Sequence, residues 1–145
     1  MKLRSSEAGQ AILETALSLS LTMAVVFWLF ELCMFSYTCS VLNSAAQQGV
    51  RYAIVHGTDS SSCSGPDSTC SNKAPYSNVQ AVVTTAATAA LHDISAMSVT
   101  VSYGSGTAAP GSPVTVKVVY AYIPYINLAG LGNTVSFSSV GQIVY

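Results

Sequence analysis

The chain has 145 residues, of which 50% are hydrophobic, and its charged fraction of 8% is about a third of the usual level in soluble proteins. With a net charge of -1 and five Lys and Arg residues in total, it lacks the basic surface that nucleic-acid binding requires. The length is sufficient for one small domain and an anchoring segment. A composition rich in Ser, Thr, Ala, Val and Tyr suits a secreted, β-rich or fibre-forming surface better than a cytosolic enzyme.

Residues 1–9 form a short polar leader that contains Lys2 and Arg4. The positive-inside rule predicts that this end stays in the cytoplasm and that the remainder lies outside. An ordinary secretory signal is cut after its apolar region. No convincing small-x-small site follows the apolar region here.

Residues 11–35 form an apolar stretch that would span roughly 37 Å as a helix, enough to cross a bilayer. Only Glu14 and Glu31 interrupt it. With Gln10 at the inner face, Glu14 would lie about 6 Å into the membrane and Glu31 about 32 Å up, near the outer interface. A carboxylate at the position of Glu14 costs free energy unless it has a partner. The simpler alternative is an interfacial carboxylate that the helix dipole favours.

Helical character continues through residues 36–55, which lack Pro, and we expect the helix to end near His56-Gly57. Such a helix would be near 68 Å long, so much of it must pack against lipid or other subunits. Small residues that permit close helix approach recur at three- and four-residue spacing, at Ala45, Ala46, Gly49 and Ala53.

The four cysteines fall into two pairs. Cys63 and Cys70 lie in a short polar loop, which predicts a disulfide because the loop has no core of its own. Free thiols and an incomplete metal site are the alternatives, although no nearby His or Cys completes a zinc set. Cys33 and Cys39 point about 120° apart on the helix, so they cannot pair within it. We expect both to be buried, with an intersubunit bridge as the alternative.

A second helix is predicted to start at Ser77, which forms a capping-box pattern with Gln80. We expect its apolar face to lie on the sheet that follows. That face consists of Val79, Val82, Val83, Ala86, Ala87, Ala90, Leu91 and Ile94.

Three strands are predicted at residues 97–103, 114–122 and 134–145 from the alternation of apolar and polar residues. The second stops at Pro124. In the third, the alternation slips around Ser138-Ser139, before Gly141, so a bulge or bend is expected there. The strand spacing favours an antiparallel meander. The fold class is therefore α+β: a long N-terminal hydrophobic helix, then a small head of one helix on a three-stranded antiparallel sheet.

Catalytic, cofactor and metal sites are not indicated. His56 and His92 each stand at a predicted helix end, without a Ser motif, phosphate loop or metal triad around them. Asp59 and Asp67 could touch Ca²⁺, but two carboxylates in a Ser-rich loop are more often solvated. We therefore expect neither an enzyme nor a metalloprotein.

The leader and the apolar run resemble the class III signal of type IV pilins and pseudopilins, with Gly9 followed at the fifth position by Glu14. Within that group the chain resembles the TadE-like family of the tight-adherence (Tad) pilus machinery. The resemblance covers residues 9–56 and is loose afterwards. Gln47 and Gln48 stand where the family often has a basic residue. The matching motifs are Gly9-Gln10-Ala11 with Glu14, Phe30-Glu31-Leu32, Ala45-Ala46 and Gly49-Val50-Arg51-Tyr52-Ala53.

The resemblance implies that a membrane-embedded prepilin peptidase cuts between Gly9 and Gln10. Cleavage would create an ammonium group at the base of an apolar helix. Glu14 of a neighbouring subunit could pair with it and fix the axial register, because any other stagger leaves a buried charge unpaired. Glu31 could likewise pair with Arg51 of another chain. Within one chain the two lie about 30 Å apart on nearly opposite faces, which excludes that pair.

These observations predict three parts: a prepilin leader at 1–9, a helix at 10–56 that forms the membrane and filament core, and an extracytoplasmic head at 57–145. The expected function is a structural subunit, minor pilin, pseudopilin or filament pilin, of a Tad or type IV-like pilus. Its expected partners are itself or other pilins, the prepilin peptidase, the assembly machinery and the membrane before assembly. It would lie in the bacterial inner membrane, N-in and C-out, and later in a periplasmic or extracellular filament. The alternative is an uncleaved single-pass protein whose outer domain is a binding module.

Overall fold

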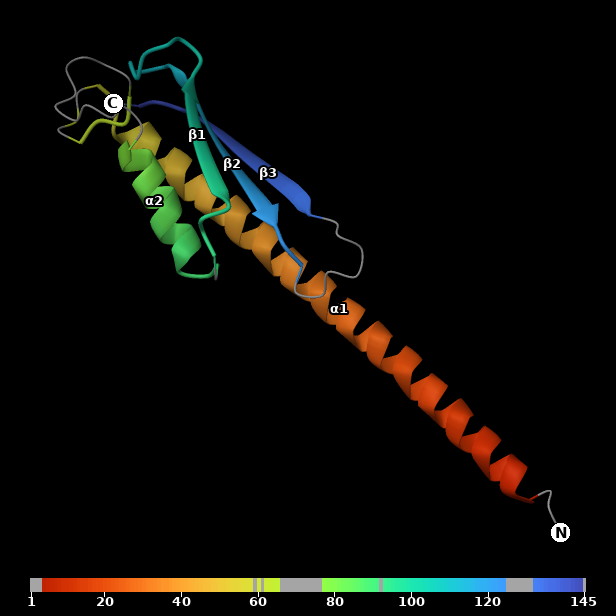
Figure 1. The fold of residues 1–145 in the computed structure, drawn as a ribbon. Helices are drawn as coiled ribbons and strands as arrows, with labels where there is room; N and C mark the ends of the chain where they lie inside the picture. Colours follow the sequence, from red (N-terminus) through yellow and green to blue (C-terminus); the bar gives the residue numbers. More distant parts are fainter. Residues whose placement is uncertain are drawn as a thin grey trace.

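The computed structural model describes residues 4–58, 60, 62–65, 77–91, 93–124 and 132–144. One helix, α1, is much longer than every other described element, and Figure 1 shows the other elements gathered around its C-terminal half. The layout is the predicted α+β arrangement of a long N-terminal helix followed by a helix and an antiparallel sheet. The elements are α1 (Arg4–Val55), α2 (Ser77–Thr88), β1 (Met97–Tyr103), β2 (Pro113–Tyr122) and β3 (Asn133–Gln142).

The three strands form an antiparallel meander in the order β1-β2-β3, as predicted. The register between β2 and β3 runs without a break from Pro113↔Gln142 to Tyr122↔Asn133. The bulge predicted near Ser138-Ser139 is therefore wrong. The strand keeps its alternation to Gln142, and the apparent slip has another cause.

That cause is the close approach of α1 to the C-terminal half of β3. Ser139 and Gly141 occupy inward-facing positions, where the alternation calls for bulky apolar residues. A Cβ added to Gly141 would lie 2.5 Å from Ile54 Cδ1 and 2.6 Å from Val50 Cγ1. Small residues at these positions make room for the helix.

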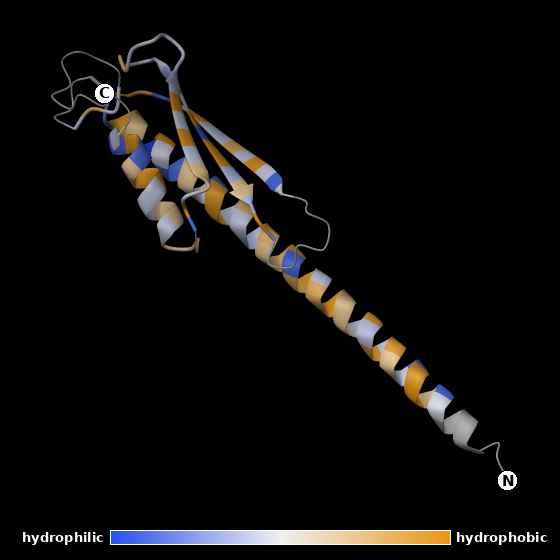
Figure 2. Ribbon diagram, viewed as in Figure 1, coloured by the Kyte–Doolittle hydropathy of each residue, from blue (hydrophilic) through white to orange (hydrophobic). Residues whose placement is uncertain are grey.

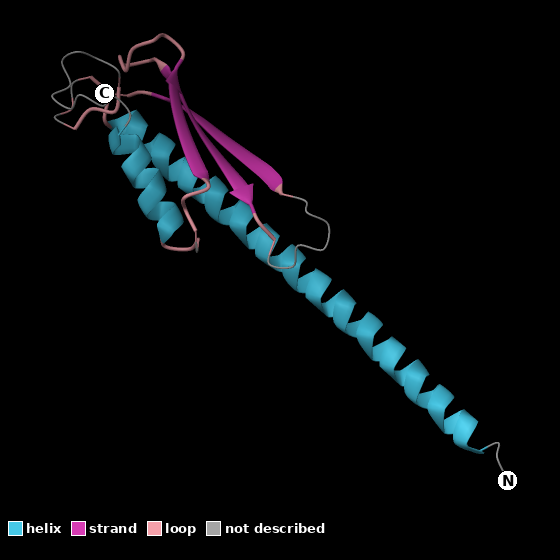
Figure 3. Cartoon of the chain, viewed as in Figure 1, coloured by secondary structure: helices cyan, strands magenta, loops and turns pink. Residues whose placement is uncertain are grey.

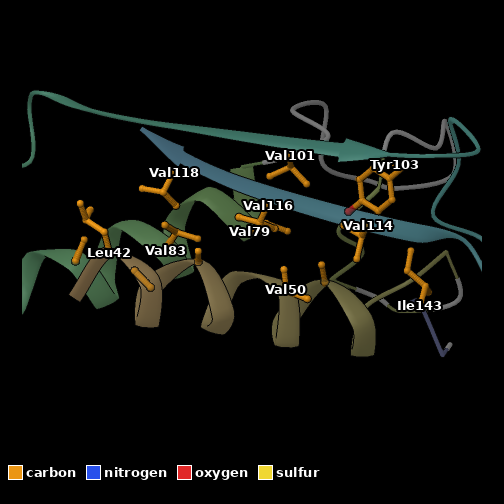
Figure 4. Packing of buried hydrophobic residues seen from close by; sticks show 14 of the residues in the cluster. Leu42, Val50, Val79, Val83, Val101, Tyr103, Val114, Val116, Val118 and Ile143 are labelled. Carbon is orange, nitrogen blue, oxygen red and sulfur yellow. The ribbon is translucent and has the colours of Figure 1, made fainter. Parts of the chain in front are cut away.

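The two helices lie on one face of the sheet, which gives a two-layer head (Figure 3). The core between the layers combines valines of α2, β1 and β2 with a small-residue stripe on α1 (Figure 4). The stripe consists of Ala45, Ala46, Gly49 and Ala53. On Gly49, an added Cβ would lie 2.4 Å from Val83 Cγ2 and 3.3 Å from Val116 Cγ1. The stripe therefore brings α1 close to its own head.

Helix α2 ends at Thr88, earlier than its apolar pattern suggested, and it buries Val79, Val83 and Ala87. We expected this face to pack mostly on the sheet. Instead α2 packs chiefly against α1, because the stripe of small residues lets the two helices approach closely. Gln80 reaches β1, where its Nε2 donates to the carbonyl oxygen of Val99 at 3.1 Å.

The C-terminal end of α1, at Val55, is held by the loop that follows it and by the C-terminal segment of the chain. The hydroxyl of the buried Ser64 donates its one proton between two acceptors, the carbonyl oxygens of His56 at 2.6 Å and of Ala53 at 3.2 Å. The Val144 amide donates to the carbonyl oxygen of Ile54 at 3.0 Å. These bonds satisfy carbonyl groups that the end of a helix leaves without intrahelical partners.

Candidate assembly and processing surface

The first part of α1 projects beyond the head, and every side chain of residues 9–30 is exposed. Most of them are apolar, as the colouring along the projecting helix in Figure 2 shows. Ile12 is 71% exposed and Trp28 is 65% exposed. In the described part of the chain, α1 alone is long and apolar enough to cross a membrane. Within a single chain, nothing among the described residues covers this surface.

The hydroxyl groups of the projecting segment largely satisfy themselves. Thr15 donates to the carbonyl oxygen of Ala11, and Ser20 and Thr22 donate in the same way to the residues four positions earlier, each at 2.8 Å. A hydroxyl bonded to its own helix needs no partner from outside. The segment can therefore enter lipid or a bundle of apolar helices without leaving these groups unsatisfied.

Glu14 differs from these hydroxyls. Its carboxylate is exposed, and the described residues provide it with no hydrogen bond or ion pair. In water this costs little. In lipid or in a packed bundle the charge requires a partner from another molecule or from a new group.

The predicted cleavage point lies inside α1, since the helix already begins at Arg4. Gly9 and Gln10 are both exposed, and a Cβ added to Gly9 would meet nothing within 4 Å apart from the backbone of its own helix. A glycine in a helix interior costs about 1 kcal/mol relative to alanine. The helix is therefore intrinsically weak at Gly9, next to the peptide bond that a peptidase would have to reach.

Glu31 lies where α1 meets the head, and its side chain accepts a hydrogen bond of 2.5 Å from the hydroxyl of Tyr122. The ring of Tyr122 also contacts the ring of Phe35 edge to face, with centroids 5.2 Å apart. The sequence analysis missed Tyr122 as a partner of Glu31, because 91 residues separate the two. The alternation along β2 placed Tyr122 on the inward face but gave no sign of which helical residue it meets.

The other predicted residues of α1 stay apart in the single chain. Arg51 is exposed in the single chain. Its pairing with Glu31 of another chain stays a prediction. Cys33 and Cys39 are free thiols. Cys39 is half-buried, but the expectation that Cys33 is buried is wrong, because its side chain is exposed in the single chain.

Several predictions concern residues that the structure does not describe. Cys63 is buried, but Cys70 lies outside the described residues, so the disulfide between them stays a prediction. Asp59, Asp67 and His92 also lie outside the described residues.

His56 lies just beyond the end of α1 and contacts the last turn of that helix. Its ring stacks on Tyr52 with centroids 4.0 Å apart, and its Nδ1 donates to the carbonyl oxygen of Tyr52 at 2.9 Å. In the described residues, no three His, Cys, Asp or Glu side chains lie close enough together to hold a metal ion.

A family model described as "TadE-like protein" matches residues 9–51. The match starts at Gly9, includes the whole exposed apolar surface, and ends at Arg51 within the part of α1 that packs on the head. No curated protein and no solved structure matches the chain. The resemblance to the TadE-like family is thereby confirmed for residues 9–51, whereas the rest of the described chain is known from its geometry alone.

Proposed function

We propose that this chain is a structural subunit of a Tad or type IV-like pilus, assembled through α1 after cleavage between Gly9 and Gln10. One observation carries the proposal. A TadE-like segment forms a projecting apolar helix whose charge, Glu14, has no partner in the described part of its own chain. The subunit could be a minor pilin, a pseudopilin or a main filament pilin. Its role is structural rather than enzymatic.

Before assembly, the apolar helix anchors the chain in the bacterial inner membrane with its N-terminus in the cytoplasm. A prepilin peptidase removes residues 1–9 and leaves the ammonium group of Gln10 as the new terminus. That group is about 6 Å along the helix from Glu14. In a bundle of α1 helices, the ammonium group of one subunit pairs with Glu14 of the next and sets the stagger between subunits. An incorrect stagger leaves a charge buried and unpaired, at a cost of several kcal/mol.

The decisive test is the mass of the mature N-terminus. The chain is expressed with a prepilin peptidase of a Tad system, and the purified protein is analysed by mass spectrometry. A terminus at Gln10 supports the proposal. Loss of that product in the Gly9→Val variant, with Gly132→Val as a control outside the leader, would assign the cut to this site.

A second function is favoured by the continuity of α1 through Gly9 and Gln10. On this alternative, the chain keeps its leader and acts as a single-pass anchor for an extracytoplasmic binding module. Recovery of a chain that starts at Met1 from cells with an active peptidase would support the anchor and contradict the pilin.

A further inference from the structure

The end of the head that points toward the projecting part of α1 consists of Tyr122, Ile123 and Pro124 together with residues 132–134, and is called here the membrane-proximal tip. Figure 1 shows that β2 ends and β3 begins at this side of the head. Tyr122 is paired with Asn133 across the sheet. The tip is fixed to α1 by the bond from Tyr122 to Glu31 and by the ring contact with Phe35.

The position of the tip along α1 coincides with the expected outer boundary of a membrane. From Gln10 to Glu31 the helix rises about 32 Å, against about 30 Å for the hydrocarbon core. Trp28, whose side chain is 65% exposed, lies one turn below Glu31. Tryptophan is enriched where the hydrocarbon meets the headgroups. The chain therefore leaves the membrane at the level where the head begins.

The chemistry of the tip fits that boundary. Ile123 is 68% exposed although it directly follows the buried Tyr122. The nearest charge along β2 is Lys117, about 17 Å from Tyr122 along the strand. From Val118 to Tyr145 the sequence has no charged residue. A lipid surface would cover Ile123 without desolvating any charge on this strand.

We propose that the membrane-proximal tip rests on the outer surface of the lipid bilayer, with Ile123 inserted at the interface. The inference rests on the membrane crossing of α1 in the proposed function. Lipid is the occupant because the tip adjoins the exposed apolar surface of residues 9–30 at the level where that surface ends. The bond between Tyr122 and Glu31 then limits how deeply α1 can be drawn into the membrane.

The test uses tryptophan fluorescence, because Trp28 is the only tryptophan in the sequence. Three full-length proteins are reconstituted in vesicles of phosphatidylethanolamine and phosphatidylglycerol that contain a brominated phosphatidylcholine: the native chain, Trp28→Phe with Ile123→Trp, and Trp28→Phe with Val140→Trp. Val140 is a matched control, since it is 67% exposed and lies about 23 Å from the start of β3. Quenching by the brominated lipid is compared with quenching by aqueous iodide.

We expect the brominated lipid to quench positions 28 and 123 several-fold more strongly than position 140, and iodide to show the opposite order. Equal behaviour of positions 123 and 140 would overturn the docking of the tip. If position 28 were still quenched by lipid in that case, the membrane crossing would stand. An iodide-accessible Trp28 would instead overturn the crossing, and the docking with it.

Discussion

Glu14 and Glu31 are the two carboxylates of the apolar stretch, and they differ in their hydrogen-bond partners. Glu31 accepts a hydrogen bond from Tyr122 in the same molecule. Glu14 projects away from the head and has no partner among the described residues. The contrast places Glu31 at the joint between helix and head, whereas Glu14 lies on the exposed surface of the projecting segment.

Replacement of Glu14 tests its assembly role. Glu14→Leu should lower the yield of filaments at least about tenfold, because a stagger-specific charge pair in a low-dielectric bundle is lost. The level of the protein in the membrane should not fall, since leucine suits lipid better than a carboxylate. Filament yield is measured by shearing and immunoblotting, and membrane level by fractionation.

Ser18→Leu is the control for this substitution. Ser18 lies one turn further along the same exposed segment, and its replacement also makes the helix more apolar. It should leave the filament yield near the wild-type level. Normal assembly of Glu14→Leu would refute the register role.

Tyr122→Phe tests the joint between helix and head. The ring contact with Phe35 is kept, and the hydroxyl that donates to Glu31 is removed. A hydrogen bond to a charged group contributes about 1.5–3 kcal/mol, and partial exposure of Glu31 places the expected loss near the lower figure. Urea unfolding in detergent measures it. Tyr37→Phe, at a residue that is 51% exposed, should change the free energy of unfolding by less than about 0.5 kcal/mol.

At the scale of elements, the packing of α1 on β3 explains the composition of the strand. The inward positions change from Val135 and Phe137 to Ser139 and Gly141 toward the C-terminal end. Side-chain volume decreases where α1 comes close to the strand, as the short distances from Gly141 to Val50 and Ile54 show. The small side chains in this half of β3 therefore make room for α1, and the pairing of β3 with β2 continues without a break.

Gly141→Ala should destabilise the head by about 1–3 kcal/mol, the usual cost of overpacking a well-packed core. The added methyl group would lie within 2.6 Å of side-chain carbons of both Val50 and Ile54. Thermal unfolding followed by circular dichroism provides the measurement. Gly132→Ala is the matched control, because an added Cβ there meets nothing within 4 Å. Equal unfolding temperatures for the two variants would contradict the close packing.

At the scale of the whole molecule, α1 consists of an exposed part and a part that packs in the head. Residues 9–30 contribute no buried side chain, whereas Leu42, Ala46 and Ala53 are fully or almost fully buried in the head. The core of the head thus includes the second half of α1. The predicted division at residue 56 separates two segments that share this core.

A fragment that starts at Glu31 should therefore fold, with a free energy of unfolding within about 1 kcal/mol of that of the full chain, because it keeps every buried residue of the core. It should float with vesicles far less than the full chain does, because it lacks the exposed apolar segment of residues 9–30. Chemical denaturation and vesicle flotation provide the two measurements. A fragment that starts at Arg51 lacks most of the stripe on α1 and should not fold cooperatively. If the fragment that starts at Glu31 failed to fold, the separation of α1 into an exposed part and a part that packs in the head would be contradicted.

The sequence by itself determined the elements and the apolar surface of residues 9–30. The apolar run, the strand alternation and the motif from Gly9 to Glu14 are local patterns, and local periodicity specifies which face of an element is apolar. Only the tertiary structure decided what each face meets. The stripe from Ala45 to Ala53 packs on its own head, Glu31 meets Tyr122, and Gly141 accommodates α1. These contacts join residues far apart in the chain, and a local pattern carries no information about such partners.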